Sequence, residues 1–383
     1  MSNYFETYDK KDCNGCGVCA LRCPKKAITM QEDEEGFLYP VIDESKCVHC
    51  GLCKKICSNN PIENNYNIKV YAAKNKDENK RNNSTSGGMF KLLAENIFSK
   101  DGIVFGVKYD SNLKVKHDYA KTIEEAKQFS ISKYVRSDLN NSFENVEKFL
   151  KEDKWVLFSG TPCQCQGLRQ YLKKDYPKLI ICEIICHSNP SPKVFEKFIK
   201  NLELKSNEKI SNFYFRSKNL KSKYKPYALY NSNKIEICDT YNNAFNSMLI
   251  SRPSCSKCNF CTSNRKADIT IGDFWGCKEF FPQFDDGKGV SLLCINSEKG
   301  EMIFSEIKDK IEYFESNLED AFKYNHHENV PVHKNRDKFF NGISDGTINE
   351  TNIIKYMNQY TKRPLPKRIL GKCKSILKKI LKH

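Results

Sequence analysis

The stretches CNGCGVCALRCP (residues 13–24) and CVHCGLCKKIC (residues 47–57) decide how the first part of the chain folds. Each contains four cysteines in the spacing C-x2-C-x2-C-x3-C. Three thiols separated by two residues can be wrapped by one tight loop onto three metal atoms of a polynuclear centre. Gly15, Gly17 and Gly51 give such a loop the positive φ angles that it often needs. We interpret the two runs as ligands of two iron–sulfur clusters.

Zinc sites and a disulfide framework are the alternatives for these cysteines. Zinc usually takes paired cysteines with a longer gap between the pairs, and a disulfide framework does not require a repeated triplet. The complete recurrence of the spacing favours clusters over both. One departure is that Ser58, rather than a proline, follows the second run, with Pro61 three residues later. This loosens the turn after Cys57 without removing a ligand.

The first run, with Pro24 directly after its fourth cysteine, resembles that of bacterial ferredoxins with two 4Fe-4S clusters. In those proteins the fourth cysteine of each run binds the other cluster. The resemblance implies one cluster on Cys13, Cys16, Cys19 and Cys57, and a second on Cys47, Cys50, Cys53 and Cys23. Short helical turns after the third cysteine of each run would direct the fourth one across.

The composition limits the compartment and the partners. The chain has 383 residues and 19 cysteines, with no visible signal peptide or long apolar run, so we expect a cytoplasmic protein. In a reducing compartment cysteines serve as metal ligands more often than as disulfides, and cluster chemistry implies low exposure to oxygen. The net charge of the chain is +16. Residues 362–383 contain nine Lys and Arg and no acidic residue, so the chain before residue 362 carries a net charge of +7. Because no nucleic-acid motif accompanies this charge, we expect no nucleic-acid partner.

Hydrophobic patterning predicts an α+β fold, a mixed α/β core with parallel and antiparallel strands behind a small ferredoxin-type domain. Strands are expected at residues 70–73, 103–107, 155–158, 179–186 and 290–295, with antiparallel strands within 210–239 and a strand that ends at a turn within 267–276. A helix is expected through residues 92–98 that stops at residues 101–102, and another through Leu168 and Leu172. Further helices are expected at residues 143–151, 192–204, 244–250 and 301–311. The expected domains are residues 1–62 with the two clusters, 66–150 and 151–325 as two parts of one core, 326–365 as a helical extension and 366–383 as a basic helix.

Five further motifs follow in order: STSGGMF (84–90), SKYVR (132–136), SGTPCQ (159–164), CHSNPSP (186–192) and, after Arg252 to Cys258, ADITIGDFWG (267–276). Together they make residues 66–320 resemble the beta subunits of coenzyme F-420 hydrogenases and dehydrogenases. The resemblance implies a flavin enzyme with FAD and a third 4Fe-4S cluster in the core. The third cluster would lie on Cys163, Cys186, Cys255 and Cys258. From the residues alone, two cysteines at strand ends and one C-x2-C pair also supply four thiolates.

Several residues have two interpretations. Cys261 adds a second C-x2-C step that competes with Cys258 or stays free. The resemblance places Ser86, Gly87, Gly88 and Lys133 at the flavin, whereas a capped turn and a surface lysine are the ordinary alternatives. His187 is expected to support the structure, and Asp273 to bond the cofactor or cap a turn. The other cysteines are expected to pack as small hydrophobic residues: Cys165, Cys182, Cys238, Cys277, Cys294 and Cys373.

The function implied by this resemblance is electron transfer between ferredoxin-type clusters and FAD, with hydride transfer to or from a deazaflavin or another small acceptor. Its partners would be a redox protein or ferredoxin and the small hydride acceptor. One alternative is a non-catalytic electron-transfer subunit that serves a partner enzyme. Another is a redox enzyme of a cell-surface polysaccharide pathway.

The C-terminal segment has its own pattern. From residue 366 to residue 383, apolar side chains recur with helical spacing and the opposite face is basic, with no acid. Such a helix fits peripheral contact with the inner face of the membrane. The alternative is a terminal helix that docks on its own domain or on a partner.

Overall fold

The computed structural model describes residues 9–60, 65–218, 224–325 and 327–362. The expected basic helix at residues 366–383 and Cys373 lie outside these ranges, so membrane contact through that helix stays a prediction. Within the described ranges, no helix combines the length and the apolar character that crossing a membrane would require.

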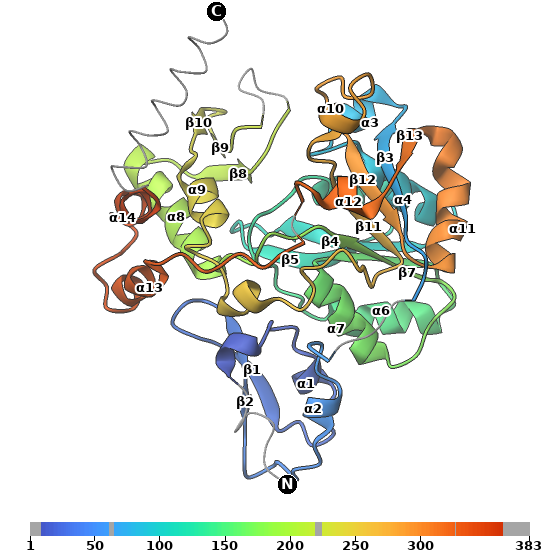
Figure 1. Ribbon diagram of the computed structural model, residues 1–383. Coiled ribbons are helices and arrows are strands. Elements are labelled where there is room, and N and C mark those ends of the chain that lie inside the picture. The colour runs from blue at the N-terminus through green and yellow to red at the C-terminus, as the bar shows by residue number, and fades with distance from the viewer. Residues whose placement is uncertain (1–8, 61–64, 219–223, 326, 363–383) are drawn as a thin grey trace, which may run out of the picture.

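Residues 9–60 form a small module at one end of the molecule (Figure 1). It consists of two short helices and one antiparallel hairpin: α1 (Val18–Leu21), β1 (Ile28–Glu32), β2 (Leu38–Ile42) and α2 (Leu52–Lys55). The hairpin turns at Gly36, whose φ of 87° suits glycine. The carboxylate of Asp33 accepts the backbone N–H of Phe37 at 2.8 Å and so closes the turn.

The core contains an eight-stranded sheet in the order β13-β3-β12-β11-β7-β6-β4-β5. The pairs β4–β6, β6–β7 and β7–β11 are parallel and the other four are antiparallel. The strands are β3 (Lys69–Asn75), β4 (Ile103–Tyr109), β5 (Val115–Ala120), β6 (Val156–Gly160), β7 (Leu179–Ile184), β11 (Ile269–Asp273), β12 (Ser291–Ile295) and β13 (Ile311–Ser316). The parallel centre brings the carboxyl ends of β6 and β7 to one edge, where ligands gather in open α/β sheets.

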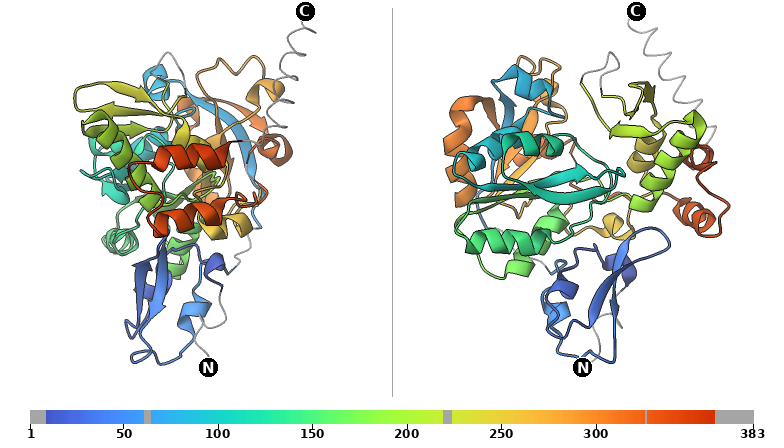
Figure 2. Two further views of the ribbon diagram at one scale, coloured as in Figure 1. Left: turned by 90° about the vertical axis from the view of Figure 1, so that its left-hand side faces the viewer. Right: turned by 180° about the vertical axis from the view of Figure 1, so that it is seen from behind.

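Helices cover both faces of this sheet (Figure 2). In β6, Val156 and Phe158 pack against one helical layer, whereas Leu157 packs against the other, as the two-residue period of a strand requires. One layer is α6 (Ser142–Lys151) and α7 (Pro162–Leu172), and the other is α4 (Met89–Phe98), α5 (Ile123–Ala126) and α11 (Glu298–Ile307). Near β3 and β12 the face of the first layer is covered by α10 (Cys277–Phe280) and α12 (Leu318–Phe322).

A second lobe packs a small sheet against helices around an aromatic core. Its elements are α8 (Pro192–Ser206), β8 (Ile210–Tyr214), β9 (Tyr227–Tyr230), β10 (Ile235–Ile237), α9 (Thr240–Asn246), α13 (Arg336–Ser344) and α14 (Ile353–Thr361). Phe37 and Tyr39 of the β1–β2 hairpin belong to the same apolar cluster as Phe195 and Phe340. The N-terminal module is therefore anchored by burial of its own aromatic side chains in this lobe.

The fold class predicted from the sequence is confirmed, but some element bounds were wrong. The strands β5 and β13 were not predicted, because β5 alternates with charged residues and β13 exposes most of its length at the sheet edge. The helix expected at 244–250 begins four residues earlier, and the one expected at 301–311 is α11, which ends at Ile307. A short helix that was not predicted, α3 (Glu78–Asn82), precedes the glycine-containing loop at 84–88.

Candidate functional site

One cavity of the N-terminal module is lined by five cysteines from both runs. Cys13, Cys16, Cys19 and Cys57 surround it, together with apolar side chains and Cys53. We call this the inner cavity, because it faces the core. Gly15 and Gly17 take φ angles of 68° and 76° there, so the loop closes as the glycines permit. Cys57 comes from the second run and lies beside the cysteines of the first run with which the sequence analysis grouped it, and its binding of a cluster there stays a prediction.

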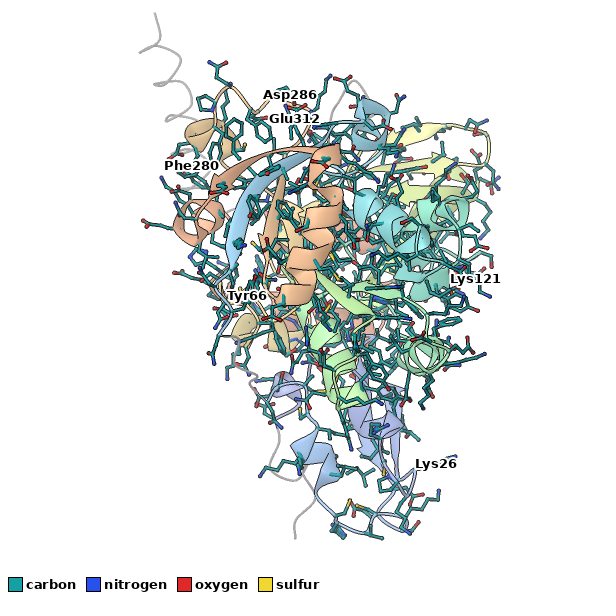
Figure 3. The ribbon with its side chains drawn as sticks, turned by 90° about the vertical axis from the view of Figure 1, so that its right-hand side faces the viewer. Lys26, Tyr66, Lys121, Phe280, Asp286 and Glu312 are labelled. Carbon is teal, nitrogen blue, oxygen red and sulfur yellow. The ribbon has the colours of Figure 1, made fainter. Side chains whose placement is uncertain are left out.

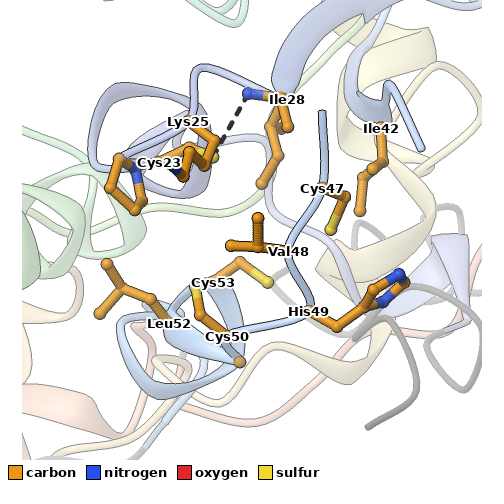
Figure 4. Close-up of a pocket in the computed structure, with 13 residues that line it drawn as sticks. Cys23, Lys25, Ile28, Ile42, Cys47, Val48, His49, Cys50, Leu52 and Cys53 are labelled. Carbon is orange, nitrogen blue, oxygen red and sulfur yellow. Dashed lines mark hydrogen bonds between the residues drawn. The ribbon is translucent and has the colours of Figure 1, made fainter. Parts of the chain in front are cut away.

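A second cavity lies further from the core and is lined by Cys23, Cys47, Cys50 and Cys53 (Figure 4). We call it the outer cavity. Its remaining wall is mostly apolar and includes Ile28, Ile42, Val48 and Leu52. Cys50 is exposed, whereas the other three cysteines are half-buried. All eight cysteines of the module thus line one of these two cavities, and Cys53 lines both.

The donor chemistry of both cavities suits an iron–sulfur cluster. Backbone N–H groups of Gly15 and Ala27 point at the sulfurs of Cys13 and Cys23 at 3.4 Å each, and the Ser58 hydroxyl donates to Cys16 Sγ at 3.2 Å. Burial raises the pKa of Cys16 to about 11, with neighbouring thiols adding to the effect. Such crowded thiolates need a positive partner, which iron provides, and hydrogen bonds to sulfur tune the cluster.

The core has a third cavity, lined by Cys163, Cys186, Cys255, Cys258 and Cys261. We call it the core cavity. Cys163 lies in the first turn of α7, directly after β6, and Cys186 follows the end of β7. Cys255 belongs to a 3-10 helix at Pro253–Lys257. The adjacent carboxyl ends of two parallel strands thus meet a loop from a distant part of the sequence, and together they bring five thiols to one site.

The cysteines of the core cavity are held by local hydrogen bonds. Thr161 and Gln164 form a reciprocal capping box that fixes the start of α7 around Cys163. The backbone N–H of Asn189 donates to Cys255 Sγ at 3.2 Å. Burial raises the pKa of Cys255 to about 11 and that of Cys258 to about 12, so these thiolates also need a positive partner. Four or five sulfurs on several elements supply the four thiolates that a 4Fe-4S cluster requires.

Cys261 lies in the wall of the core cavity. Its thiol donates to the carbonyl oxygen of Glu328 at 3.1 Å, and its backbone N–H donates to the carbonyl of Cys258 at 3.2 Å. Cys261 therefore lies close enough to compete with Cys258 as a ligand, which is one of the two alternatives that the sequence left open. His187 also lines this cavity and packs edge-on against Phe245, with 5.0 Å between ring centroids.

A buried histidine network supports the loop that carries Cys163. His117 lies between the carbonyl of Ser159 at 3.1 Å and the hydroxyl of Ser137 at 3.0 Å, and its ring stacks on Phe158. The amide of Gln164 donates to the same Ser137 hydroxyl at 2.9 Å. The network joins β5 to the carboxyl end of β6 and to the first turn of α7.

This network predicts a dependence of stability on pH. Burial lowers the pKa of His117 to about 4, from an ordinary value of about 6.5. The folded protein therefore favours the neutral ring, and its stabilisation is complete above about pH 6.5 and lost as pH falls towards 4. The loss is at most about 1.4 kcal/mol per pH unit. We expect His117→Gln to make the melting temperature less sensitive to pH between about 7 and 5. An unchanged pH dependence would contradict this assignment.

The predicted flavin-contact loops lie next to each other. The backbone N–H of Ser132 donates to Thr85 Oγ1 at 3.2 Å, which joins the loop at 84–88 to the segment at 132–136. Several polar groups of the first loop are already bonded within the protein. Gly87 N–H donates to Ser291 Oγ at 2.9 Å, and the Ser86 hydroxyl donates to the Val290 carbonyl at 3.1 Å. Gly88, with φ of 88°, begins α4.

Cationic side chains gather around these loops. The Lys218 ammonium donates to the carbonyls of Ser86 and Arg81, and burial lowers its pKa to about 8. Lys133 donates to the carbonyls of Gln128 and Ile131, and burial lowers its pKa to about 7. In the described part of the chain, neither lysine has a carboxylate at ion-pair distance, so an anionic ligand would be complementary here.

Asp273 is engaged by another side chain. Its carboxylate forms an ion pair with Arg216, whose guanidinium lies over the rings of Tyr224 at 4.9 Å and Trp275 at 5.2 Å. Trp275 is 47 % exposed, so an aromatic surface opens beside Lys218 and Arg216. Neither of the two roles expected for Asp273 included this ion pair, because a partner 57 residues away gives no local sequence signal.

The remaining cysteines of the described ranges line none of the three cavities. All five are buried in apolar surroundings: Cys165, Cys182, Cys238, Cys277 and Cys294.

The residues that sequence reasoning missed are two buried arginines, Arg136 and Arg252. Arg136 contacts Cys163 Sγ at 3.5 Å, and Arg252 contacts the carbonyl oxygen of Cys13 at 2.7 Å. Arg136 ends the motif SKYVR and Arg252 begins the segment 252–258, and membership in these motifs was the one feature of the sequence that could have indicated a role.

Comparison with known protein families gives matches to two separate segments of the chain. Residues 153–321 match the family model for the C terminus of the coenzyme F420 hydrogenase/dehydrogenase beta subunit, and residues 12–60 match a 4Fe-4S dicluster domain. An uncharacterized ferredoxin of Methanocaldococcus jannaschii is 40% identical over 72 residues, which cover 19% of this chain and 87% of that protein. A solved structure of the xenon-derivatized F420-reducing NiFe hydrogenase complex from Methanosarcina barkeri has a chain with 16% identity and a TM-score of 0.46. That alignment covers 78% of this chain and 94% of the other.

Proposed function

Because the chain belongs to the coenzyme F-420 hydrogenase/dehydrogenase beta-subunit family and carries a 4Fe-4S dicluster domain, we propose that it is an iron–sulfur flavoprotein oxidoreductase. Electrons would pass between the N-terminal module and FAD in the core, with hydride transfer to or from a deazaflavin or another small acceptor. The observation that carries this proposal is the series of three cysteine-lined cavities. A 4Fe-4S cluster exchanges one electron at a time and a flavin exchanges two, and that is the chemistry these groups supply when bound.

The proposed ligand sets are those that the sequence resemblance implies, and the lining of the three cavities supports them. We assign Cys13, Cys16, Cys19 and Cys57 to the inner cavity, and Cys23, Cys47, Cys50 and Cys53 to the outer one. In the core cavity we assign Cys163, Cys186, Cys255 and Cys258. Each set has four sulfurs, which is the number that a cubane requires.

The inner cavity lies against the core, which supports a continuous electron route. Gly167 of α7 leaves room for Cys16, since a Cβ at Gly167 would lie 3.0 Å from the Cβ of Cys16. The same helix presents Cys163 to the core cavity at its first turn. One helix of eleven residues therefore touches both sites.

The flavin is proposed beside the loop at 84–88 and the segment at 132–136. Lys133 and Lys218 supply positive charge for diphosphate or for a reduced, anionic ring, which is one way that a protein tunes a flavin. The exposed face of Trp275 supplies an aromatic surface for a planar ring. Ser86, Gly87 and Gly88 would meet the cofactor from the start of α4.

Electrons would enter through the outer cavity from a small acidic carrier protein. Cys50 and Val48 are exposed there, with Val48 at 56 %. Lys25, Lys54 and Lys55 are exposed on the segments that form this cavity, and Lys26 lies at the far end of the module (Figure 3). Among the described residues these four lysines have no ion-pair partner. An apolar centre with a basic rim fits a partner of opposite charge.

A charge reversal tests this docking face. We expect the double variant Lys54→Glu, Lys55→Glu to be reduced at least about tenfold more slowly by a reduced acidic ferredoxin at low salt, because electrostatic steering is lost. The difference should shrink as salt is raised. Stopped-flow absorbance of the clusters gives the rate, after the iron content has been shown to be normal. Lys205→Glu, on an exposed part of α8, serves as the control. Equal slowing in both variants would contradict the assignment of this face.

The proposed activity is tested with the full chain, a reduced carrier and an oxidised deazaflavin under anaerobic conditions. Reduction of the deazaflavin, dependent on bound flavin, is the expected result. If flavin is bound but the deazaflavin is not reduced, the acceptor is another small molecule. The second candidate function is a non-catalytic electron-transfer subunit, and it is favoured by the internal bonds that already occupy Ser86 and Gly87. Clusters without any flavin would support that candidate.

A further inference from the structure

Two buried arginines lie where the N-terminal module meets the core. Arg136 is 7 % exposed, and its guanidinium donates to the Gly15 carbonyl at 3.0 Å and to Cys163 Sγ at 3.5 Å. Arg252 is 1 % exposed and donates to the carbonyls of Cys13 at 2.7 Å and Leu38 at 3.0 Å. Arg136 therefore spans from the loop around the inner cavity to a cysteine of the core cavity.

The loop around the inner cavity is shaped to accept Arg252. A Cβ at Gly15 would lie 2.9 Å from a guanidinium nitrogen of Arg252 and 3.0 Å from the Leu38 carbonyl. The charged group also lies 4.0 Å from the centroid of the Tyr39 ring. In sequence, Arg252 comes three residues before Cys255, and the N–H of Cys255 donates to its carbonyl at 3.0 Å. The second arginine therefore also links the two sites.

The other buried arginines of the described ranges provide an internal comparison. Each has a carboxylate partner: Arg81 with Asp286, Arg265 with Glu183 and Arg336 with Glu35. Arg136 and Arg252 have none within ion-pair distance among the described residues. A buried charge without a counter-ion is strongly unfavourable. The two arginines that lack a carboxylate are the two that contact the cysteine loops.

We propose that Arg136 and Arg252 are positioning residues whose counter-ions are the negatively charged thiolate–iron centres of the inner and core cavities, so that they set the potential of both. This inference rests on the cluster ligands of the proposed function. A cubane with four thiolates is negatively charged, and its reduction adds one more negative charge. Positive charge between the two sites therefore favours the reduced state of each and offsets their mutual repulsion.

The step supported by this arrangement is the transfer of one electron. With clusters bound, transfer of an electron from the inner to the core site would oxidise the first and reduce the second. No bond would form or break and no proton would move. A reduced carrier protein at the outer cavity would supply the electron. The two guanidinium groups also hold the backbone of the module at Gly15 and Cys13, which keeps the distance between the sites fixed.

The test is an anaerobic redox titration of the full, iron-loaded chain, monitored by electron paramagnetic resonance. We expect Arg136→Gln to lower the midpoint potential of the core site. At a fixed ambient potential the ratio of reduced to oxidised core site should fall about tenfold. For a one-electron couple this corresponds to a decrease of about 59 mV in the midpoint potential. Arg136→Lys keeps the charge and should restore most of the potential. Arg336→Gln is the matched control, because it breaks the ion pair to Glu35 of the module away from any cavity cysteine.

Unchanged potential in Arg136→Gln, or an equal shift in Arg336→Gln, would overturn the proposal. Arg136→Gln could also lose the iron of the core site. Retention of that iron by Arg136→Lys would then support a requirement for positive charge, whereas loss of iron from both variants would overturn the proposal. The same comparison of Arg252→Gln with Arg252→Lys, monitored at the inner site, gives a second measurement. Neither titration needs flavin or a hydride acceptor. A missing flavin would therefore refute the proposed activity and leave this inference standing.

Discussion

Cys163→Ala is expected to lower the iron content by about one cubane, from about twelve to about eight irons per chain. Cys163 is buried, lies at the start of α7 and is the only cavity cysteine that this helix supplies among the described residues. Removing its thiolate leaves one iron without a protein ligand on that side of the cavity. The two sites of the N-terminal module share no cysteine with the core cavity and should keep their iron.

The control for this prediction is Cys165→Ala, two residues further along the same helix. Cys165 is buried, but its thiol contacts the carbonyl of Gly160 at 3.6 Å and lines none of the three cavities. Iron content should be normal in this variant. Cys163→Ala is also combined with Cys261→Ala, because Cys261 is the spare thiol of the cavity. Unchanged iron in both the single and the double variant would refute the core ligand set.

Phe158→Ala is expected to lower the free energy of unfolding by about 3–5 kcal/mol. The ring is fully buried in β6 and packs against Phe105, Phe143 and His117. Its loss creates a cavity in the middle of the sheet, a large effect against a total stability of about 5–15 kcal/mol. The strand leads directly into the loop of Cys163, so the core site should also lose iron more easily on heating. Urea unfolding at pH 7 measures the effect.

Leu204→Ala is the comparison for the core variant. Leu204 lies on α8 and is 65 % exposed, so its truncation should change stability by about 0.5 kcal/mol or less. A similar loss of stability in both variants would mean that the packing described for β6 does not stabilise the sheet.

Local sequence patterns contained most of the information about the cysteine sites. The repeated spacing predicted two cysteine-rich sites, and the resemblance to ferredoxins implied the exchange of the fourth cysteines. In the structure Cys57 lies with cysteines of the first run and Cys23 with those of the second. Cys163 and Cys186 were predictable as neighbours because the carboxyl ends of adjacent parallel strands meet at one edge. These predictions depend on short-range spacing and on the geometry of strands.

The arginines were not predictable in the same way. Arg136 and Arg252 are separated from Gly15 and Cys13 by more than a hundred residues, and only the docking of the module brings them together. The edge strand β13 was missed because its side chains are mostly exposed and show no alternation. Cys261 stays ambiguous because five thiols surround a site that needs four. Long-range packing decides all three cases.

Quantitation of iron, acid-labile sulfide and released flavin in the anaerobically purified full chain tests the central claim most directly. The account predicts about twelve irons, a similar amount of sulfide and about one FAD per chain. About eight irons without flavin would contradict it, since only the N-terminal module would then be loaded. The protein would in that case be an electron carrier, and the hydride chemistry would belong to a partner.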